Sequence, residues 1–238
     1  MAEHLTSTVA AARMTDGTKI YGSGDTEVRA LNGVTVNFER GRFTAIMGPS
    51  GSGKSTLMHC VAGLDDLTSG TVHIGDVELS SLSDRDLTLL RRDKVGFVFQ
   101  AYNLIPVFSA AENVEFVMEL QGVPAPERRT RATELLAQVE LEGLGDKRPL
   151  EMSGGQQQRV AVARALASRP RIILADEPTA HLDSKTALRL LDLMVGLNRE
   201  GGTTFLFSSH DPLVLERARR RVWLRDGGID RIEEGATA

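Results

Sequence analysis

Short apolar runs alternate with longer amphipathic segments along most of the chain. Val34, Val36 and Phe38 alternate with polar residues, which is typical of a strand with one buried face. Other apolar runs are continuous and have the length of strands that are buried on both faces. The predicted strands are residues 34–38, 43–47, 71–74, 95–99, 172–175 and 203–209. Because such strands alternate with helical segments, the pattern predicts an α/β fold with a largely parallel sheet.

The segment 101–158 differs from the rest because it shows helix signals without a convincing strand. Ser109 and Glu112 have the spacing of a capping box before an apolar helical stripe. A second helix is predicted to begin near Pro126 and to run to about Val139. We therefore expect a helical block inserted into the α/β core, which resumes after it and ends in a hairpin with an Asp-Gly turn.

One segment carries a very specific chemical pattern. It follows the strand at 43–47, precedes an apolar helical segment, and matches G-x-x-x-x-G-K-[ST] in full. Its glycines let backbone N–H groups turn toward an anion, and the helix that starts near Lys54 adds its positive end. Lys54 can reach the β- and γ-phosphates of a nucleotide, and the Ser55 hydroxyl can ligate Mg²⁺. The loop comprises Gly48, Pro49, Ser50, Gly51, Ser52, Gly53, Lys54, Ser55 and Thr56.

Two carboxylates follow the apolar run 172–175. Ligands of a parallel sheet bind at the carboxyl ends of its strands, so we expect Asp176 beside the phosphate loop, where it can hold Mg²⁺. Glu177 reaches one residue further and can polarise an attacking water. Taken alone, the two residues would fit a solvated strand end. The complete phosphate loop upstream favours the catalytic interpretation.

Three further segments fit either a functional or an ordinary structural role, and the rest of the site decides which role is favoured. Gln100 ends a predicted strand and can ligate Mg²⁺ or position water, whereas alone it fits a surface glutamine. His210 also follows a strand and can donate to a γ-phosphate oxygen, whereas alone it fits a loop residue. The third segment begins a helix and is either an ordinary cap or a second anion site. It comprises Ser153, Gly154, Gly155 and Gln156.

Composition narrows the function classes. The net charge of −4 gives no sign of a nucleic-acid partner. Apolar runs stay well short of the ~20 residues that span a bilayer. The first residues lack the basic and apolar regions of a secretory signal, and we expect a disordered leader there. Cys60 is a single cysteine, which excludes an intrachain disulfide, so these features favour the cytoplasm.

Together, these motifs resemble the nucleotide-binding subunit of ABC transporters from about residue 14 to 232. The resemblance assigns three motifs that contact the nucleotide: Walker A at 48–55, Walker B at 172–176 and the signature motif at 153–156. It assigns the general base to Glu177, the switch histidine to His210 and the adenine-stacking aromatic to Tyr21. It places the Q-loop at Gln100 and the D-loop at 180–183. His181 departs from the Asn, Gly or Ala that is usual at its D-loop position, and Met152 stands where Leu is commoner.

The resemblance implies a P-loop NTPase fold with an N-terminal antiparallel β region and an inserted α-helical subdomain. The implied division is a leader at 1–12, a RecA-like ATP-binding core with its β subdomain at 13–100 and 159–238, and the helical subdomain at 101–158. It also implies ATP and Mg²⁺ as cofactors and a head-to-tail homodimer with each ATP between Walker A and the partner's signature motif. Integral membrane permease subunits would place the chain peripherally at the cytoplasmic face of the inner membrane.

A short permease helix is expected to bind near the Q-loop. Candidate contacts are Tyr102, Leu104, Ile105 and Phe108, although the same residues also fit subdomain core. The segments 91–100, 103–106 and 112–114 resemble the lipoprotein-release and macrolide-export group. That group implies export or extraction of a lipoprotein, lipid or hydrophobic substrate.

Three alternatives remain at this point. The chain can be a mechanotransmitting ATPase that controls an envelope partner without transport, or an importer ATPase, which only the subgroup resemblance disfavours. The third is an ABC-type ATPase that acts on DNA or ribosomes. A single cassette, an acidic net charge and the absence of sustained heptads between Walker A and the signature motif argue against it.

Overall fold

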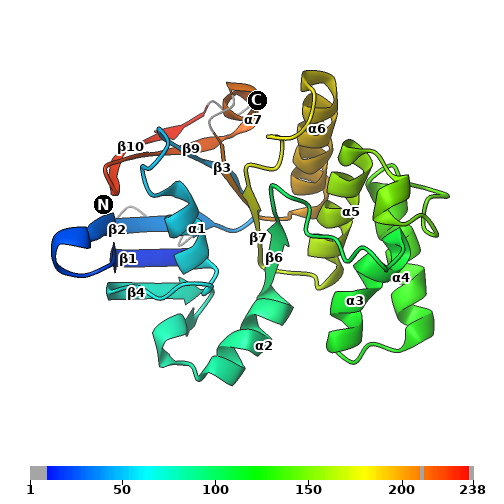
Figure 1. Cartoon of the computed structure of the whole chain (residues 1–238), viewed down its shortest axis with the longest axis horizontal. Helices are drawn as coiled ribbons and strands as arrows, with labels where there is room; N and C mark the ends of the chain where they lie inside the picture. The colour runs from blue at the N-terminus through cyan, green and yellow to red at the C-terminus, as the bar shows by residue number, and fades with distance from the viewer. Residues whose placement is uncertain (1–9, 210–211, 236–238) are drawn as a thin grey trace, which may run out of the picture.

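Two β-sheets lie beside a group of helices in the computed structural model, which describes residues 10–209 and 212–235 (Figure 1). The strands are β1 (Ala10–Tyr21), β2 (Val28–Glu39), β3 (Phe43–Met47), β4 (Ser69–Ile74), β5 (Val77–Glu78), β6 (Val95–Val98), β7 (Ile172–Asp176), β8 (Phe205–Ser208), β9 (Arg220–Arg225) and β10 (Gly228–Glu234). The helices are α1 (Lys54–Val61), α2 (Asp84–Lys94), α3 (Ala110–Leu120), α4 (Ala125–Gln138), α5 (Gly154–Ala167), α6 (Ser184–Gly201) and α7 (Pro212–Arg217). Short 3-10 turns are η1 (Gly24–Thr26), η2 (Leu79–Ser81) and η3 (Pro149–Glu151).

The six-stranded sheet has the order β10-β9-β3-β8-β7-β6, and its strands are parallel except for the β10–β9 pair. Its residues alternate between two apolar clusters. Phe43, Ala45 and Met47 pack toward α3–α6, whereas Ile46 packs into the cluster that contains Leu57 of α1. The sheet is thus buried on both faces, and the predicted mostly parallel α/β core is confirmed.

The second sheet is antiparallel, with the order β2-β1-β4-β5. Val34, Val36 and Phe38 of β2 are buried, as their alternation predicts. The expected leader at 1–12 is wrong at its end, because Ala11 and Ala12 are buried within β1. Residues 1–9 lie outside the described residues.

The helices α3, α4, α5 and α6 form the group on the right of Figure 1. Residues 101–153 contain no strand, which agrees with the predicted helical block. The expected boundary at 158 falls inside α5, so the chain returns to the sheet within one continuous helix. Gly96 of β6 lets α5 approach closely, because a Cβ there would lie 2.6 Å from the carbonyl oxygen of Ala165.

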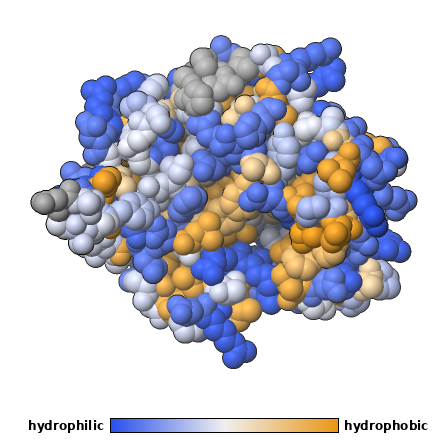
Figure 2. Space-filling model, viewed as in Figure 1, coloured by the Kyte–Doolittle hydropathy of each residue, from blue (hydrophilic) through white to orange (hydrophobic). Residues whose placement is uncertain are grey.

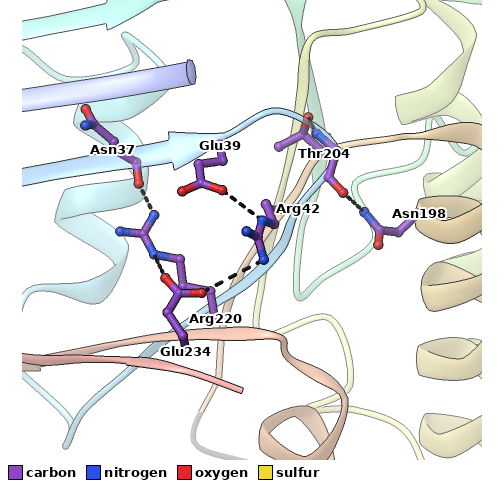
Figure 3. A network of polar contacts seen from close by, with 8 residues as sticks. Asn37, Glu39, Arg42, Asn198, Thr204, Arg220 and Glu234 are labelled. Carbon is purple, nitrogen blue, oxygen red and sulfur yellow. Dashed lines mark hydrogen bonds and ion pairs between the residues drawn. The ribbon is translucent and has the colours of Figure 1, made fainter. Parts of the chain in front are cut away.

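The C-terminal hairpin β9–β10 forms as predicted, and Asp226 and Gly227 in its turn have φ values of 49° and 75°. Positive φ at both central residues is typical of the tight turn that Asp-Gly favours. A polar network fastens this hairpin to the amino end of β3 (Figure 3). Arg220 donates to the carbonyl of Asn37, and Glu234 pairs with Arg220 at 3.1 Å and with Arg42 at 3.9 Å.

The same network reaches α6. The side-chain amide of Asn198 donates to the carbonyls of Gly41 at 2.9 Å and Thr203 at 2.7 Å, and Arg42 donates to Glu39 at 2.8 Å. Asn198 is buried, so its loss would leave these carbonyls without a partner. The amino ends of β3 and β8 are therefore held firmly, while their carboxyl ends carry the candidate site.

Candidate functional site

The carboxyl ends of four neighbouring parallel strands meet along one edge of the sheet. The register pairs Ala45 of β3 and Ala175 of β7 with Phe207 of β8, and Val98 of β6 with Ala175. The residues that follow these strands therefore lie at one level, which is where an α/β sheet binds ligands. This edge brings the phosphate loop, the two carboxylates and Gln100 into one row.

The phosphate loop turns sharply between β3 and α1. Gly48, Gly51 and Gly53 have φ values of 148°, 78° and 98°, which other residues rarely adopt. A Cβ at Gly48 would lie 2.3 Å from the carbonyl oxygen of Leu224, and one at Gly53 would lie 2.4 Å from that of Ala30. Gly53 precedes the first turn of α1, so the loop leads directly into a helix N-terminus. The geometry suits a bound anion.

Lys54 is buried, and its ammonium is held inside this loop. Its Nζ donates to the carbonyls of Gly48 at 2.8 Å and Pro49 at 2.9 Å. An ammonium has three donors, so one remains for a further acceptor. The Ser52 hydroxyl is buried without a hydrogen-bond partner among the residues that the structure describes. A fixed cation, a helix N-terminus and curled backbone together fit phosphate groups.

Asp176 lies at the end of β7 against two hydroxyls. Its Oδ1 accepts from Ser208 at 2.5 Å and from Ser55 at 3.4 Å. Carboxylate and hydroxyl oxygens suit Mg²⁺, which usually keeps several waters and binds few protein groups. Residues 10–209 and 212–235 contain no cluster of three or more His, Cys, Asp or Glu that could hold a metal.

Glu177 has a left-handed backbone with φ of 46°, which is unusual for a residue other than glycine. Its N–H donates to the carbonyl of Ser208 at 3.0 Å, which ties the turn to β8. Strained backbone of this kind persists where the surroundings determine it, and it often marks a functional position. The other residue predicted to face the γ-phosphate, His210, lies outside the described residues.

Ser153 caps α5 with the reciprocal bonds that its spacing predicts. The Ser153 hydroxyl accepts from the Gln156 N–H at 3.3 Å, and the Ser153 N–H donates to the Gln156 side chain at 2.9 Å. A Cβ at either glycine would also crowd a neighbouring side chain. A Cβ at Gly154 would lie 2.7 Å from the Tyr102 hydroxyl, and one at Gly155 would lie 2.4 Å from a methyl of Thr186.

Tyr21 ends β1 with 41% of its surface exposed. Its hydroxyl donates to Asp65, and the Lys19 ammonium lies 4.9 Å from the ring centroid and 2.5 Å from Asp65. Burial, followed by the bond to Asp65, raises the pKa of Tyr21. Although burial alone would raise it, the bonds from Lys19 and Tyr21 lower the pKa of Asp65. These contacts hold the Tyr21 ring in place, and its exposed part can stack on a base.

Gln100 does not contact Ser55 or Asp176 through any hydrogen bond in the described part of the chain. It contacts His181 of the D-loop instead. Beside it, the buried Gln158 of α5 donates to the carbonyls of Phe99 at 3.3 Å and Pro178 at 2.9 Å. The sequence analysis did not identify Gln158, because a glutamine among neighbouring glutamines in a helix gives no signal of a buried bridge.

The candidate permease contacts Tyr102, Leu104, Ile105 and Phe108 are half-buried, and Leu104 packs against the core. Val107, between them, has 69% of its surface exposed. The buried Asn113 fixes this loop: its amide donates to the carbonyls of Ile105, Phe108 and Ser109, and its Oδ1 accepts from the Ile105 N–H. Figure 2 shows apolar side chains gathered over this segment and α3.

The chain is similar in sequence to known ATP-binding proteins. Residues 31–180 match the family described as ABC transporter. The chain is 47% identical over 221 residues to an uncharacterized ABC transporter ATP-binding protein of Methanocaldococcus jannaschii, covering 91% of this chain and 94% of that protein. It is 49% identical over 217 residues to the macrolide export ATP-binding/permease protein MacB of Hyphomonas neptunium, covering 90% of this chain and 33% of that protein.

A solved structure is also similar over almost the whole chain. It is a dimeric ATP-binding cassette in a post-hydrolysis state, bound to ADP and Pi. The two share 44% sequence identity with a TM-score of 0.86, and the match covers 95% of this chain and 100% of that one.

Proposed function

The chain belongs to the ABC transporter family and is an ATPase of that family, and from this premise we propose that two copies close around two ATP molecules to drive separate permease subunits. One observation supports a composite site, which is an ATP site formed by residues of both copies. The chain has two helix N-termini suited to anions, at Lys54 and at Gly154. They belong to different parts of the fold, because α1 follows β3 of the six-stranded sheet and α5 lies in the helical group (Figure 1). A two-fold dimer can use both surfaces twice.

The roles we propose combine the positions described above with the roles that the family resemblance implies for Gln100 and His210. Lys54 and the loop N–H groups bind the phosphates, while Tyr21 stacks on the adenine. Ser55 and Asp176, with Gln100, would hold Mg²⁺, which neutralises phosphate charge when bound. Glu177 accepts a proton from the attacking water, and His210 donates to the γ-phosphate. The signature residues of the second copy donate N–H groups to the same phosphate.

The permease subunits would bind at the loop 102–108, where Val107 is exposed and Asn113 holds the backbone rigid. A rigid apolar segment beside a helical group can receive a short helix. In the described residues, no helix is long and apolar enough to cross a bilayer. This chain also spans 33% of the ATP-binding/permease relative. We propose a peripheral position at the cytoplasmic face of the inner membrane, in contact with integral membrane permease subunits.

The substrate class we propose is a lipoprotein, lipid or other hydrophobic molecule that is exported or extracted. The relatives named for macrolide export favour export over import. Mechanical control of an envelope partner without transport is the second candidate, because the same ATP-driven closure serves both. Co-purification of the partner proteins from the native membrane separates both candidates from an importer. An importer would co-purify with a substrate-binding protein as well as its membrane subunits.

Substituting Ser153 tests the composite site. In a Glu177→Gln background that retains ATP, the chain should elute as a dimer with ATP and Mg²⁺ in size-exclusion chromatography. Adding Ser153→Arg should return it to the monomer, because the arginine would occupy the space that the second copy's phosphate needs. Each monomer should still bind nucleotide through residues 48–56, which calorimetry can measure.

Ser83→Arg is the matched control. Ser83 is also an exposed N-cap, and its hydroxyl accepts from the Asp86 N–H at the start of α2. This variant loses the same kind of cap, at a cost of about 1 kcal/mol, and gains the same arginine. It should still dimerise. An ATP-dependent dimer that persists with Ser153→Arg would show that 153–156 is a helix cap alone.

A further inference from the structure

His181 is the D-loop residue that departs from the family pattern, and both of its ring nitrogens lie against Gln100. Its Nδ1 is 3.2 Å from the main-chain oxygen of Gln100, and its Nε2 is 3.4 Å from the side-chain Nε2 of Gln100. The two residues are 81 positions apart in the sequence. His181 is exposed, so packing in the core does not account for its place.

The chemistry of the two contacts determines the tautomer. A carbonyl oxygen only accepts, so Nδ1 must carry the proton that it donates to Gln100. In a neutral imidazole the other nitrogen then has a free lone pair, and Nε2 accepts from the amide N–H of Gln100. The amide is planar, so turning its nitrogen toward His181 turns its oxygen Oε1 to the opposite side.

We propose that His181 is a positioning residue that holds the Gln100 side chain with Oε1 facing away from the D-loop. Oε1 is the atom with which Gln100 can ligate a cation or accept from water. Without the imidazole, the amide can rotate and present its NH₂ group instead, which does neither. This inference rests on the proposed role of Gln100 in the ATPase site.

The surrounding contacts show why one imidazole can hold two loops together. The buried Gln158 bridges Phe99, next to Gln100, and Pro178, two residues before the D-loop. His181 bridges the same two segments further out. Residues 177–182 form a tight turn. The Ala180 N–H donates to the carbonyl of Glu177 at 3.1 Å, and the Leu182 N–H donates to that of Thr179 at 3.0 Å.

These hydrogen bonds connect the Q-loop to the segment that carries Glu177. The loop 102–108, where we place the permease, begins two residues after Gln100. His181 thus lies on a short mechanical path between that surface and the proposed general base. The path consists of two loops that are joined at their bases by Gln158 and at their tips by His181.

The tautomer is a direct test that does not depend on ATP hydrolysis. In the full chain labelled with ¹⁵N-histidine, the two-bond ¹⁵N–¹H pattern shows which ring nitrogen carries the proton. His181→Phe assigns the resonances by removing one set. We expect the Nδ1–H tautomer for His181, and Gln100→Ala should shift its Nε2 resonance while Nδ1 stays protonated. A predominant Nε2–H tautomer would overturn the proposal.

Steady-state ATPase kinetics test the consequence. His181→Phe keeps the volume and loses both hydrogen bonds, so kcat should fall about fivefold while KM for ATP changes less than about twofold. His181→Gln should recover much of the loss, because its longer side chain can place Oε1 where Nε2 lies and accept from the Gln100 amide. In the Gln100→Ala background, His181→Phe should have little further effect.

Three outcomes of these measurements would contradict the inference. Equal kcat for wild type and His181→Phe would remove the positioning role. Losses that multiply in the double variant would show that His181 does not act through Gln100. If Gln100→Ala left kcat unchanged while the Nδ1–H tautomer was present, the contact would stand, but the role of Gln100 and the positioning inference would both fail.

Discussion

Glu177→Gln is expected to lower ATP turnover by about 10²–10⁴, the range of a positioned general base, with ATP binding retained. An amide has nearly the shape of the carboxylate, but it cannot accept the proton of an attacking water. The left-handed backbone at Glu177 fixes where this side chain leaves β7, so the substitution changes the chemistry and not the fold. Turnover is measured as phosphate release, and binding by calorimetry.

Glu200→Gln is the matched control. Glu200 is exposed near the end of α6, at the edge of the sheet opposite to the site. It should keep wild-type turnover. The Glu177→Gln variant should also accumulate an ATP-dependent dimer, since bound ATP is no longer removed. Near-normal turnover of Glu177→Gln, assayed with the membrane subunits, would contradict the general-base role.

Lys54→Ala is expected to weaken ATP binding by about 10- to 100-fold, the equivalent of losing a charge-assisted hydrogen bond in a water-poor site. The ammonium is fixed by Gly48 and Pro49, so its position depends little on flexible neighbours. Turnover should fall with binding. Calorimetric titration with ATP measures the affinity, and urea unfolding checks that the variant folds.

Lys94→Ala provides the comparison for this substitution. Lys94 is an exposed lysine at the end of α2, before the amino end of β6, away from the phosphate loop. Its loss should leave ATP affinity unchanged. If Lys54→Ala kept both affinity and turnover, residues 48–56 would not be a Walker A loop.

The parts of the site that could be predicted from sequence are those whose chemistry is local. The phosphate loop needs a positive φ at Gly48, Gly51 and Gly53, which is a local requirement, so its pattern lies in consecutive residues. The Ser153 cap and the Asp-Gly turn are also local, and both formed as predicted. Strand alternation in β2 was equally clear, because one face is buried and the other is exposed.

The parts that could not be predicted depend on partners far along the chain. β1 contains Asp16 and Gly17, which are poor strand formers, and it is stabilised by pairing with β2 on one side and β4 on the other. Gln158 bridges carbonyls that lie 59 and 20 positions away. The sequence identified His181 as unusual, but it could not show Gln100 as its neighbour.

The most direct test of the composite site mixes two defective chains in the Glu177→Gln background. One carries Lys54→Ala and the other Ser153→Arg, and trapped ATP is measured by gel filtration with labelled nucleotide. Neither variant alone can complete a site. In a mixed dimer, the intact phosphate loop of one chain meets the intact signature motif of the other. We predict that mixing restores trapped ATP, at about one per mixed dimer. If the mixture traps no more ATP than the separate variants, the site does not form between two copies of this chain.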